Sequence, residues 1–297
     1  MKKELEIDVK PLIKKLEAAI RKLTEGRIMS RYRKVFKGKG LEFEDFRVYH
    51  EDDDSSRIDW KATVRAGKTL IREYKEERDL DVYFLVDISA SMVFGSTKKL
   101  KNEYSAELVS ALSYFILNSG DNVGLIMFNG NIVKNIIPAN KRTQYYVLLK
   151  NLVDANLYGG ECNLAKAIKY VTDSTKKRGV MIVVSDFLGL KNDDWVEAIK
   201  IASVKFDLIG FIVRDPRDEK LPRGIGKVTI SDPFSSKEIL VDPDEIGKEY
   251  EDYAKKQKNV IKRIFTRYGS KLIELYTDQD FVKPVLLFLK GREKEFV

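Results

Sequence analysis

Residues 81–92 read Asp81-Val-Tyr-Phe-Leu-Val-Asp87-Ile-Ser89-Ala-Ser91-Met92, and this stretch decides the fold. Its run of apolar, β-branched and aromatic residues predicts a strand that is buried on both faces. The run ends in a carboxylate and two hydroxyls, which the strand would carry into a loop at its carboxyl end. Open α/β sheets bind their ligands at that edge, so we expect the functional site there.

The spacing of Asp87, Ser89 and Ser91 has a physical use. Alternate residues in a tight turn can point their oxygens at one small volume, and carboxylate and hydroxyl oxygens suit a hard divalent cation. An alternative is that the two serines cap the following helix, as serine often does. Short patterns of this kind also recur by accident, so the local pattern alone leaves both interpretations open.

Beyond Met92, helical and strand patterns alternate along the chain. We expect strands at 122–128, 131–137, 180–185, 206–213 and 271–276, and helices at 98–118, 141–153, 163–177, 192–203, 244–268 and 280–290. This alternation predicts that residues 81–297 form one α/β domain, a doubly wound, mostly parallel sheet flanked by helices. Prolines and two short β-like runs predict a hairpin insertion at about 215–244.

Residues 1–80 are expected to form an extension that packs on this domain. Apolar residues at helical spacing, interleaved with lysines and arginines, predict an amphipathic helix at 9–23. Packing on the body of the protein is favoured over docking on a membrane surface. Residues 41–49 predict an extended segment. The acidic run 51–54 predicts a turn whose carboxylates are solvated or salt-bridged rather than bound to a cation.

Composition narrows the class of protein. The 297 residues, of which 43% are hydrophobic, are enough for one large domain with additions. The single cysteine, Cys162, excludes an internal disulfide and fits a reducing compartment. The start lacks the apolar stretch of a signal peptide, and no run approaches the roughly 18 to 20 apolar residues of a spanning helix. We therefore expect a cytoplasmic protein without a transmembrane segment.

The net charge of +8 raises the question of nucleic-acid binding. The 54 basic residues are interleaved with 46 acidic ones, which is typical of a solvated surface rather than of a stripe that follows phosphates. We expect no nucleic-acid partner. A basic nucleic-acid-binding protein is kept as an alternative, and the densest basic stretch, 21–39, is where the nucleic acid would bind.

Two later stretches can meet the loop that follows Asp87. One is the loop from Gly159 to Leu164, which precedes a helix, and the other is Asp186, which follows Ser185 at the end of an apolar strand. The carboxyl ends of neighbouring parallel strands lie at the same edge of a sheet. If these strands are neighbours, both carboxylates and the hydroxyls converge there.

These motifs resemble known families. The D-x-S-x-S run, the G-G-x-x-x-L loop and the strand ending in Ser-Asp resemble the von Willebrand factor A fold with its metal-ion-dependent adhesion site (MIDAS). The upstream half resembles the signature of the domain-of-unknown-function 58 family. Its matching residues are Gly40-Leu-Glu-Phe, Arg47, Tyr49, Asp53-Asp54, Arg57-Ile-Asp59-Trp60, Arg65, Arg72-Glu73-Tyr74 and Glu77-Arg78. Together the motifs cover residues 30–245.

The resemblance implies a non-catalytic protein-protein interaction module, commonly found alongside a MoxR-type AAA+ ATPase, with a role in assembly, maturation or chaperone-like regulation. It implies that Asp87, Ser89, Ser91 and Asp186 hold Mg²⁺ or Mn²⁺, directly or through water, and leave one position for a partner carboxylate. The chain departs from the family at Cys162, which stands where threonine is usual.

A thiol is a poor ligand for Mg²⁺, so Cys162 is a doubtful member of the site. The missing oxygen would come from water, from Glu161 or from Asn163; otherwise the site would be degenerate and hold no metal.

Enzymatic functions have less support in the sequence. A serine hydrolase would need a base near Ser89 or Ser91, and the only histidine, His50, lies outside the βα core. A metal-dependent hydrolase or phosphatase that uses Asp87 and Asp186 is kept as an alternative. The G-x-x-x-x-G-K-[ST] loop that binds nucleotide phosphates does not occur, so ATP would belong to a partner.

Overall fold

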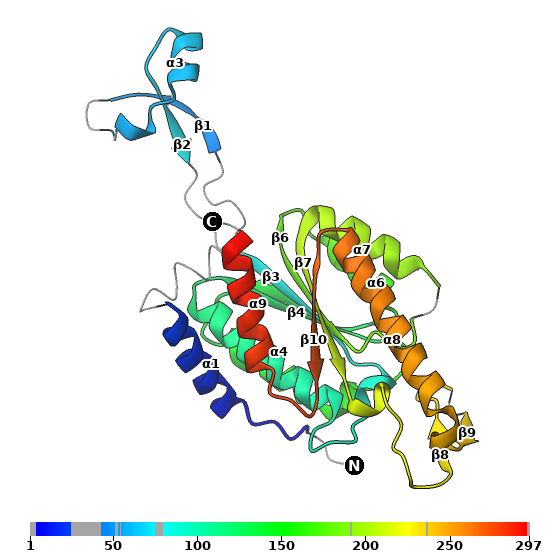
Figure 1. Cartoon of the computed structure of the whole chain (residues 1–297). Coiled ribbons are helices and arrows are strands. Elements are labelled where there is room, and N and C mark those ends of the chain that lie inside the picture. The colour runs from blue at the N-terminus through cyan, green and yellow to red at the C-terminus, as the bar shows by residue number, and fades with distance from the viewer. Residues whose placement is uncertain are drawn as a thin grey trace.

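The computed structural model describes residues 4–24, 43–50, 53, 55–74, 80–190, 192–235 and 237–295. A six-stranded sheet forms its centre (Figure 1). In spatial order its strands are β10 (Lys271–Tyr276), β7 (Phe206–Arg214), β6 (Gly179–Ser185), β3 (Asp81–Asp87), β4 (Asn122–Phe128) and β5 (Ile132–Ala139). All pairs are parallel except β4–β5. The predicted doubly wound, mostly parallel sheet is confirmed, while the antiparallel direction of its edge strand was not predicted.

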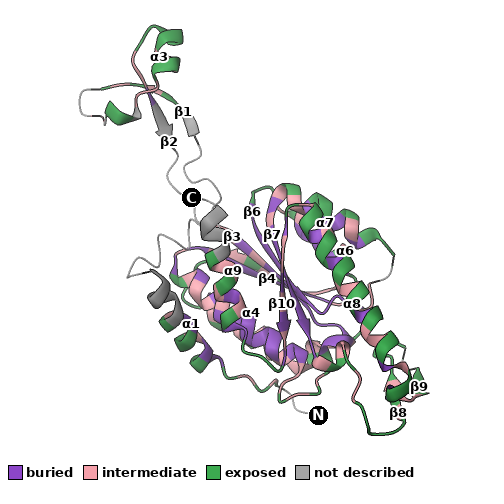
Figure 2. Cartoon of the chain, viewed as in Figure 1, coloured by how far each residue is buried: buried purple, intermediate pink, exposed green. Residues whose placement is uncertain are grey.

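Strand β3 lies in the interior of the sheet, between β6 and β4. Successive side chains of a strand point to opposite faces. Val82, Phe84 and Val86 accordingly contribute to one core cluster and Leu85 to the other. All four are fully buried, and Figure 2 shows most of the sheet in the colour of buried residues. The continuous apolar run of this strand therefore follows from burial on both faces.

Helices cover both faces of the sheet. One face carries α1 (Val9–Thr24), α4 (Lys101–Asn118), α5 (Gln144–Leu152) and α9 (Val282–Glu295), and the other carries α6 (Leu164–Ser174), α7 (Asp194–Lys205) and α8 (Pro243–Arg267). Leu12 and Leu16 of α1 are buried in the first core cluster. The amphipathic helix therefore packs on the domain, which was the favoured interpretation of its sequence.

Gly210 is the point at which β7 meets β10 and α8. A Cβ atom at this position would lie 2.7 Å from both Leu272 Cδ1 and Phe265 Cε1. We expect Gly210→Ala to lower the free energy of unfolding by about 1–3 kcal/mol, because the extra methyl group overpacks the core. Urea unfolding measures the change. Gly247→Ala in α8 is the matched control, since a Cβ there meets nothing within 4 Å; an equal loss in both variants would contradict the prediction.

A small unit upstream of the sheet consists of β1 (Phe43–Val48) and β2 (Leu70–Tyr74), which pair antiparallel, and the short helix α3 (Trp60–Ala66). Figure 1 draws this unit away from the sheet, and none of the residues of the unit whose side chains the structure describes belongs to the two core clusters of the domain. That it packs on the domain stays a prediction. Helix α3 was not predicted: Asp59 caps it by accepting from the backbone N–H groups of Lys61 and Ala62.

The acidic turn of this unit is described at Asp53. Its carboxylate accepts from both terminal nitrogens of Arg47, at 2.9 and 2.7 Å, and from the backbone N–H of His50 at 2.8 Å. The hydrogen bond from Arg47 is the main cause that lowers the pKa of Asp53 to about 2. This carboxylate is thus salt-bridged, in agreement with the expectation for the turn. Residues 51, 52 and 54, and residues 25–39 of the basic stretch, lie outside the described residues.

Strands β8 (Val228–Ser231) and β9 (Glu238–Val241) form an antiparallel hairpin inside the predicted insertion, next to α8 in Figure 1. In the described part of the chain, no helix combines the length and the apolar character that crossing a membrane requires.

Candidate cation and partner site at the carboxyl edge of the sheet

Three carboxylates follow three adjacent parallel strands. Asp87 ends β3, Asp186 follows β6 and Asp215 follows β7. All three are fully buried. The first two lie where the chain reverses its direction of winding, between β3 and β6, which is the usual ligand position in a doubly wound sheet. The sequence predicted Asp87 and Asp186. Asp215 was missed, although the same strand-end rule finds it.

Asp87 and the two serines lie as the sequence predicted. Asp87 accepts from Ser89 N at 2.9 Å and from Ser185 Oγ at 2.6 Å. The hydroxyl oxygens of Ser89 and Ser91 are 3.2 Å apart, and both side chains are buried. Ser89 precedes a 3₁₀ turn, Ala90–Val93, without capping it through its side chain. Helix capping therefore does not account for Ser89, and its oxygen stays in the cluster.

The glycine loop is tied to the tip of β3. Gly159 N donates to Ile88 O at 2.7 Å, and Ala90 N donates to Gly160 O at 2.9 Å. Both glycines have positive φ, 128° and 84°, which side chains other than hydrogen disfavour. The structure therefore brings the two sequence motifs together as expected.

Cys162 reaches the site from this loop, because its Sγ donates to Asp87 Oδ2 at 3.4 Å. Asn163 instead caps α6 by accepting from Lys166 N at 3.0 Å. Glu161 is exposed. The thiol of Cys162 is thus the group of this loop that contacts Asp87, and Asn163 uses its side-chain oxygen in the helix cap. Burial, and then the charge of Asp87, raises the pKa of Cys162 far above its ordinary value, so the thiol stays protonated.

Asp186 is positioned by an unusual backbone. The next residue, Phe187, is buried and has φ = 53°, a conformation that is strained for a bulky residue. Phe187 N donates to Ser185 Oγ at 2.9 Å, and Leu188 N donates to Asp186 Oδ1 at 2.8 Å. Strain of this kind costs about 1–3 kcal/mol and gathers at functional sites. No pattern in the sequence predicted the strained backbone at Phe187.

Lys101 is the main residue that sequence reasoning missed. Its Nζ donates to Asp186 Oδ2 at 2.7 Å and to Asp218 Oδ2 at 2.9 Å, and the side chain is 1% exposed. Lys101 is the first residue of α4, where the helix dipole disfavours a positive charge. That mismatch with the helix dipole was the one available signal in the sequence.

The charges of the site are unevenly neutralised. Burial, and then the neighbouring charge of Asp186, raises the pKa of Asp87 to about 6. Burial acts to raise the pKa of Asp186 as well, but the positive charges of Lys101 and Arg214 outweigh it and lower that pKa. For Lys101, burial is outweighed by Asp186 and Asp218, so its pKa is raised and it stays an ammonium. Asp87 therefore has hydrogen-bond donors but no positively charged partner among the residues that the structure describes.

These residues fit a hard divalent cation in most respects. Two hydroxyl oxygens and the oxygens of Asp87 and Asp186 are the ligand types that Mg²⁺ accepts. Within the described ranges, no three His, Cys, Asp or Glu side chains form a cluster that could hold a metal, so a cation would depend on Ser89 and Ser91. Cys162 does not fit, and Lys101 already occupies one oxygen of Asp186.

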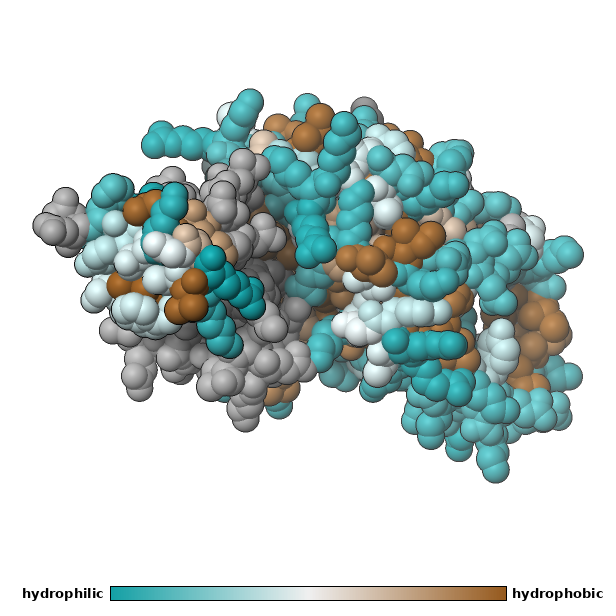
Figure 3. Space-filling model, turned by 90° about the horizontal axis from the view of Figure 1, so that it is seen from above, coloured by the Kyte–Doolittle hydropathy of each residue, from teal (hydrophilic) through white to brown (hydrophobic). Residues whose placement is uncertain are grey.

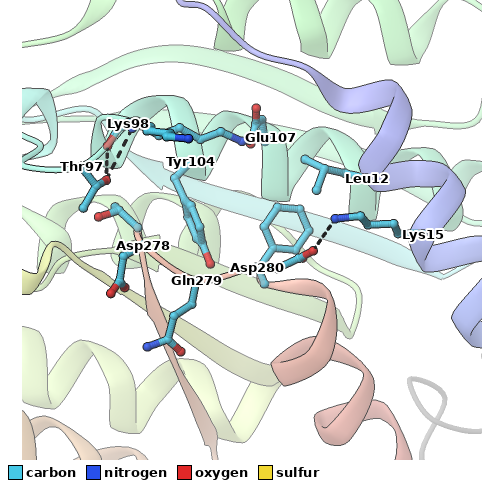
Figure 4. Close-up of a pocket in the computed structure, with 12 residues that line it drawn as sticks. Leu12, Lys15, Thr97, Lys98, Tyr104, Glu107, Asp278, Gln279 and Asp280 are labelled. Atoms are coloured by element: carbon cyan, nitrogen blue, oxygen red, sulfur yellow. Dashed lines mark hydrogen bonds and ion pairs between the residues drawn. The ribbon is translucent and has the colours of Figure 1, made fainter.

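A pocket of about 570 Å³ lies between α1, the segment before α4, the first turns of α4 and the loop after β10 (Figure 4). Its wall includes Lys15, which pairs with Asp280 at 2.8 Å, and Tyr104. Thr277 lines it too and donates to Asp215 Oδ2 at 3.1 Å. Thr277 therefore joins this charged pocket to the edge of the sheet that carries the site.

Comparison with known proteins identifies relatives along most of the chain. The family model described as "Protein of unknown function DUF58" matches residues 45–260. The uncharacterized protein Rv1480 of Mycobacterium tuberculosis is 25% identical over 286 residues, which cover 95% of this chain and 89% of the relative. The uncharacterized protein MAV169 of Mycobacterium avium is 27% identical over 134 residues, covering 44% of this chain and 77% of the relative.

Solved structures with a related arrangement include the conserved hypothetical protein BatB from Bacteroides thetaiotaomicron, with a TM-score of 0.49 and 16% identity, covering 72% of this chain and 99% of that one. The VWA domain of SpRpn10 has a TM-score of 0.42 and 9% identity, covering 70% and 94%. The strand order of this chain, its antiparallel edge strand and its two helical layers make a doubly wound α/β fold.

Proposed function

Because the chain belongs to the DUF58 family of proteins of unknown function, we propose that it is a non-catalytic protein-interaction module that binds its partner at the carboxyl edge of the sheet. The observation that carries the proposal is the buried cluster of Asp87, Ser89 and Ser91, in which Asp87 lacks a positive partner. Hydrogen bonds offset the burial of this carboxylate only in part, because its pKa is still raised, and such a residue in a buried cluster supports a role in binding.

In this proposal Asp87, Ser89, Ser91 and Asp186 would hold Mg²⁺ or Mn²⁺. The cation would neutralise Asp87 and offer a position to a carboxylate of the partner. Ser185 and the backbone N–H of Ser89 orient Asp87 through the hydrogen bonds described above. The glycine loop holds Cys162 against the same carboxylate. In this proposal the chain supplies a preorganised set of cation ligands, and the partner supplies a carboxylate.

A MoxR-type AAA+ ATPase is the partner that we propose to test first, because the family resemblance of the motifs implies it. We further propose that the pair acts in the cytoplasm in assembly, maturation or chaperone-like regulation. An enzymatic role has no comparable support. His50 is exposed and belongs to the small upstream unit, and Lys101 already occupies one of the two carboxylates that a metal phosphatase would use.

The test is a pull-down of the AAA+ ATPase with the full chain as bait. We expect retention in Mg²⁺, release by EDTA, and loss of retention with Asp87→Asn, because the neutral amide attracts a cation far less than a carboxylate does. Asp173→Ala is the control, since Asp173 is an exposed acid on α6. Retention that stays at the level of the wild type in Mg²⁺, both in EDTA and with Asp87→Asn, would contradict the metal-centred face.

If EDTA and Asp87→Asn both leave retention unchanged, the small upstream unit becomes the next candidate for the contact with the partner. Trp60 and Val64 lie one helical turn apart on α3 and are 68% and 81% exposed. On the face seen in Figure 3, hydrophilic side chains predominate and hydrophobic ones form small groups, some of them on this unit. A double substitution at Trp60 and Val64 would then be the next variant to test.

A further inference from the structure

The environment of Lys101 is unusual for a lysine. The side chain is 1% exposed, and its ammonium is shared between Asp186 at 2.7 Å and Asp218 at 2.9 Å. The Phe94 ring lies 5.6 Å from the same nitrogen. Lysine is almost never fully buried unless it is paired, and the first turn of a helix disfavours its charge. The two ion pairs therefore account for the burial of this lysine, and its position on the helix does not.

The partners of Lys101 come from three separate parts of the chain. Lys101 begins α4, Asp186 follows β6, and Asp218 ends the 3₁₀ turn Pro216–Asp218 after β7. Asp218 is fixed in turn, because its Oδ2 also accepts from Asp215 N at 2.9 Å. The ammonium is thus held in place by a preorganised pair of carboxylates at the edge where the proposed cation would bind.

We propose that Lys101 is a built-in counter-ion that competes with the divalent cation for Asp186 and so weakens cation binding at this site. This inference rests on the proposed function, because it concerns regulation of that same site. Lys101 already supplies Asp186 with the positive charge that a cation would bring. The ammonium of Lys101 then repels a divalent cation beside Asp87, and it already occupies one oxygen of Asp186.

The consequence is a cation affinity that depends on Lys101. With lysine in place, the site is expected to fill only at high concentrations of Mg²⁺ or Mn²⁺. Cys162 acts in the same direction, because its thiol replaces a harder oxygen ligand. Displacing the ammonium of Lys101 from Asp186 would tighten cation binding. The ion pair between Lys101 and Asp186 would therefore set the affinity of this site for the cation.

The experiment is a titration of the full chain with Mn²⁺, in which isothermal calorimetry measures the binding. The variants are Lys101→Met, which removes the charge at similar length, and Lys101→Gln, which keeps a hydrogen-bond donor for Asp186. Removing one unit charge a few ångströms from a cation is expected to tighten Mn²⁺ binding at least about tenfold. Lys98→Met is the matched control, because Lys98 is an exposed lysine of the same segment.

A second readout does not depend on calorimetry. Ligand binding raises the melting temperature, so Mn²⁺ is expected to raise that of Lys101→Met and Lys101→Gln more than that of the wild type and Lys98→Met. If Lys101→Met fails to fold cooperatively, Lys101→Gln alone decides the outcome.

The inference is overturned if wild type and both Lys101 variants bind Mn²⁺ with the same affinity. That result would leave the proposed cation site intact. If neither the wild type nor the variants bind Mn²⁺, the cation part of the proposed function fails and the inference fails with it.

Discussion

Asp186→Ala is expected to lower the free energy of unfolding by about 3 kcal/mol, measured in EDTA. The substitution leaves the buried Lys101 ammonium with Asp218 alone, and breaking a buried ion pair by removing one partner costs about 3–5 kcal/mol. The remaining partner places the expected loss at the lower end of this range. Urea unfolding near neutral pH gives the measurement.

A double-mutant cycle separates the ion pair from other effects of the substitution. Lys101→Met combined with Asp186→Ala is expected to recover part of the lost stability, because the buried ammonium is then gone and only Asp218 has lost its positive partner. Asp173→Ala, at an exposed position of α6, is the control and should change little. A loss below about 1 kcal/mol in Asp186→Ala would show that the ion pair does not constrain this edge of the sheet.

Asp87→Asn is expected to stabilise the protein at neutral pH in the absence of metal. The pKa of Asp87 is raised from 3.8 to about 6, first by burial and then by Asp186. Between these two values the folded state keeps a proton that the unfolded state has released. The stability from this group is therefore fully present below pH 3.8 and is lost as the pH rises through 6.

The size of this effect follows from the shift. About two pKa units correspond to roughly 3 kcal/mol, an order-of-magnitude figure for a buried carboxylate near another charge. Asparagine can accept from Ser89 N and donate to Ser185 Oγ without a charge, and it gives up only the long hydrogen bond from Cys162 Sγ. Urea unfolding in EDTA should show a clear gain for Asp87→Asn at pH 7.5 and little difference at pH 4. An equal difference at both values would contradict the prediction.

Together, the two predictions describe a site in which a residue needed for the proposed binding lowers the stability of the fold. Asp87 costs stability when it is ionised, and Phe187 adds backbone strain next to Asp186. Asp186 stabilises the edge through Lys101. A substitution at Asp87 should therefore strengthen the fold while it removes the proposed binding, which distinguishes a functional residue from a purely structural one.

Much of the domain was predictable because local patterns and burial agree there. The apolar runs of β3 and β6 are buried on both faces, so each reads as a strand without tertiary information. The two strands are neighbours in a parallel sheet, and this places Asp87 and Asp186 at one edge. The direction of β5 was not predictable in the same way, because a half-exposed edge strand fits either orientation.

Other features depend on contacts between distant segments. Helix α3 was not predicted, because the acidic run before it indicated a turn. Asp59 before the helix and Gly67 after it, with φ = 65°, are nevertheless ordinary helix-cap signals. The role of Lys101 depends on Asp218, which lies 117 residues away and follows a different strand. A lysine beside other lysines looks like a solvated side chain in the sequence, and tertiary placement alone shows that it is buried.

The measurement that tests the central claim most directly is an anomalous difference map from crystals of the wild-type chain soaked in Mn²⁺. The account predicts a peak among Ser89, Ser91 and the carboxylates of Asp87 and Asp186, and no peak at that position in Asp87→Asn. A map without that peak in the wild type, at Mn²⁺ concentrations that saturate the calorimetric titration, would contradict the claim that this edge of the sheet is a cation-centred binding face.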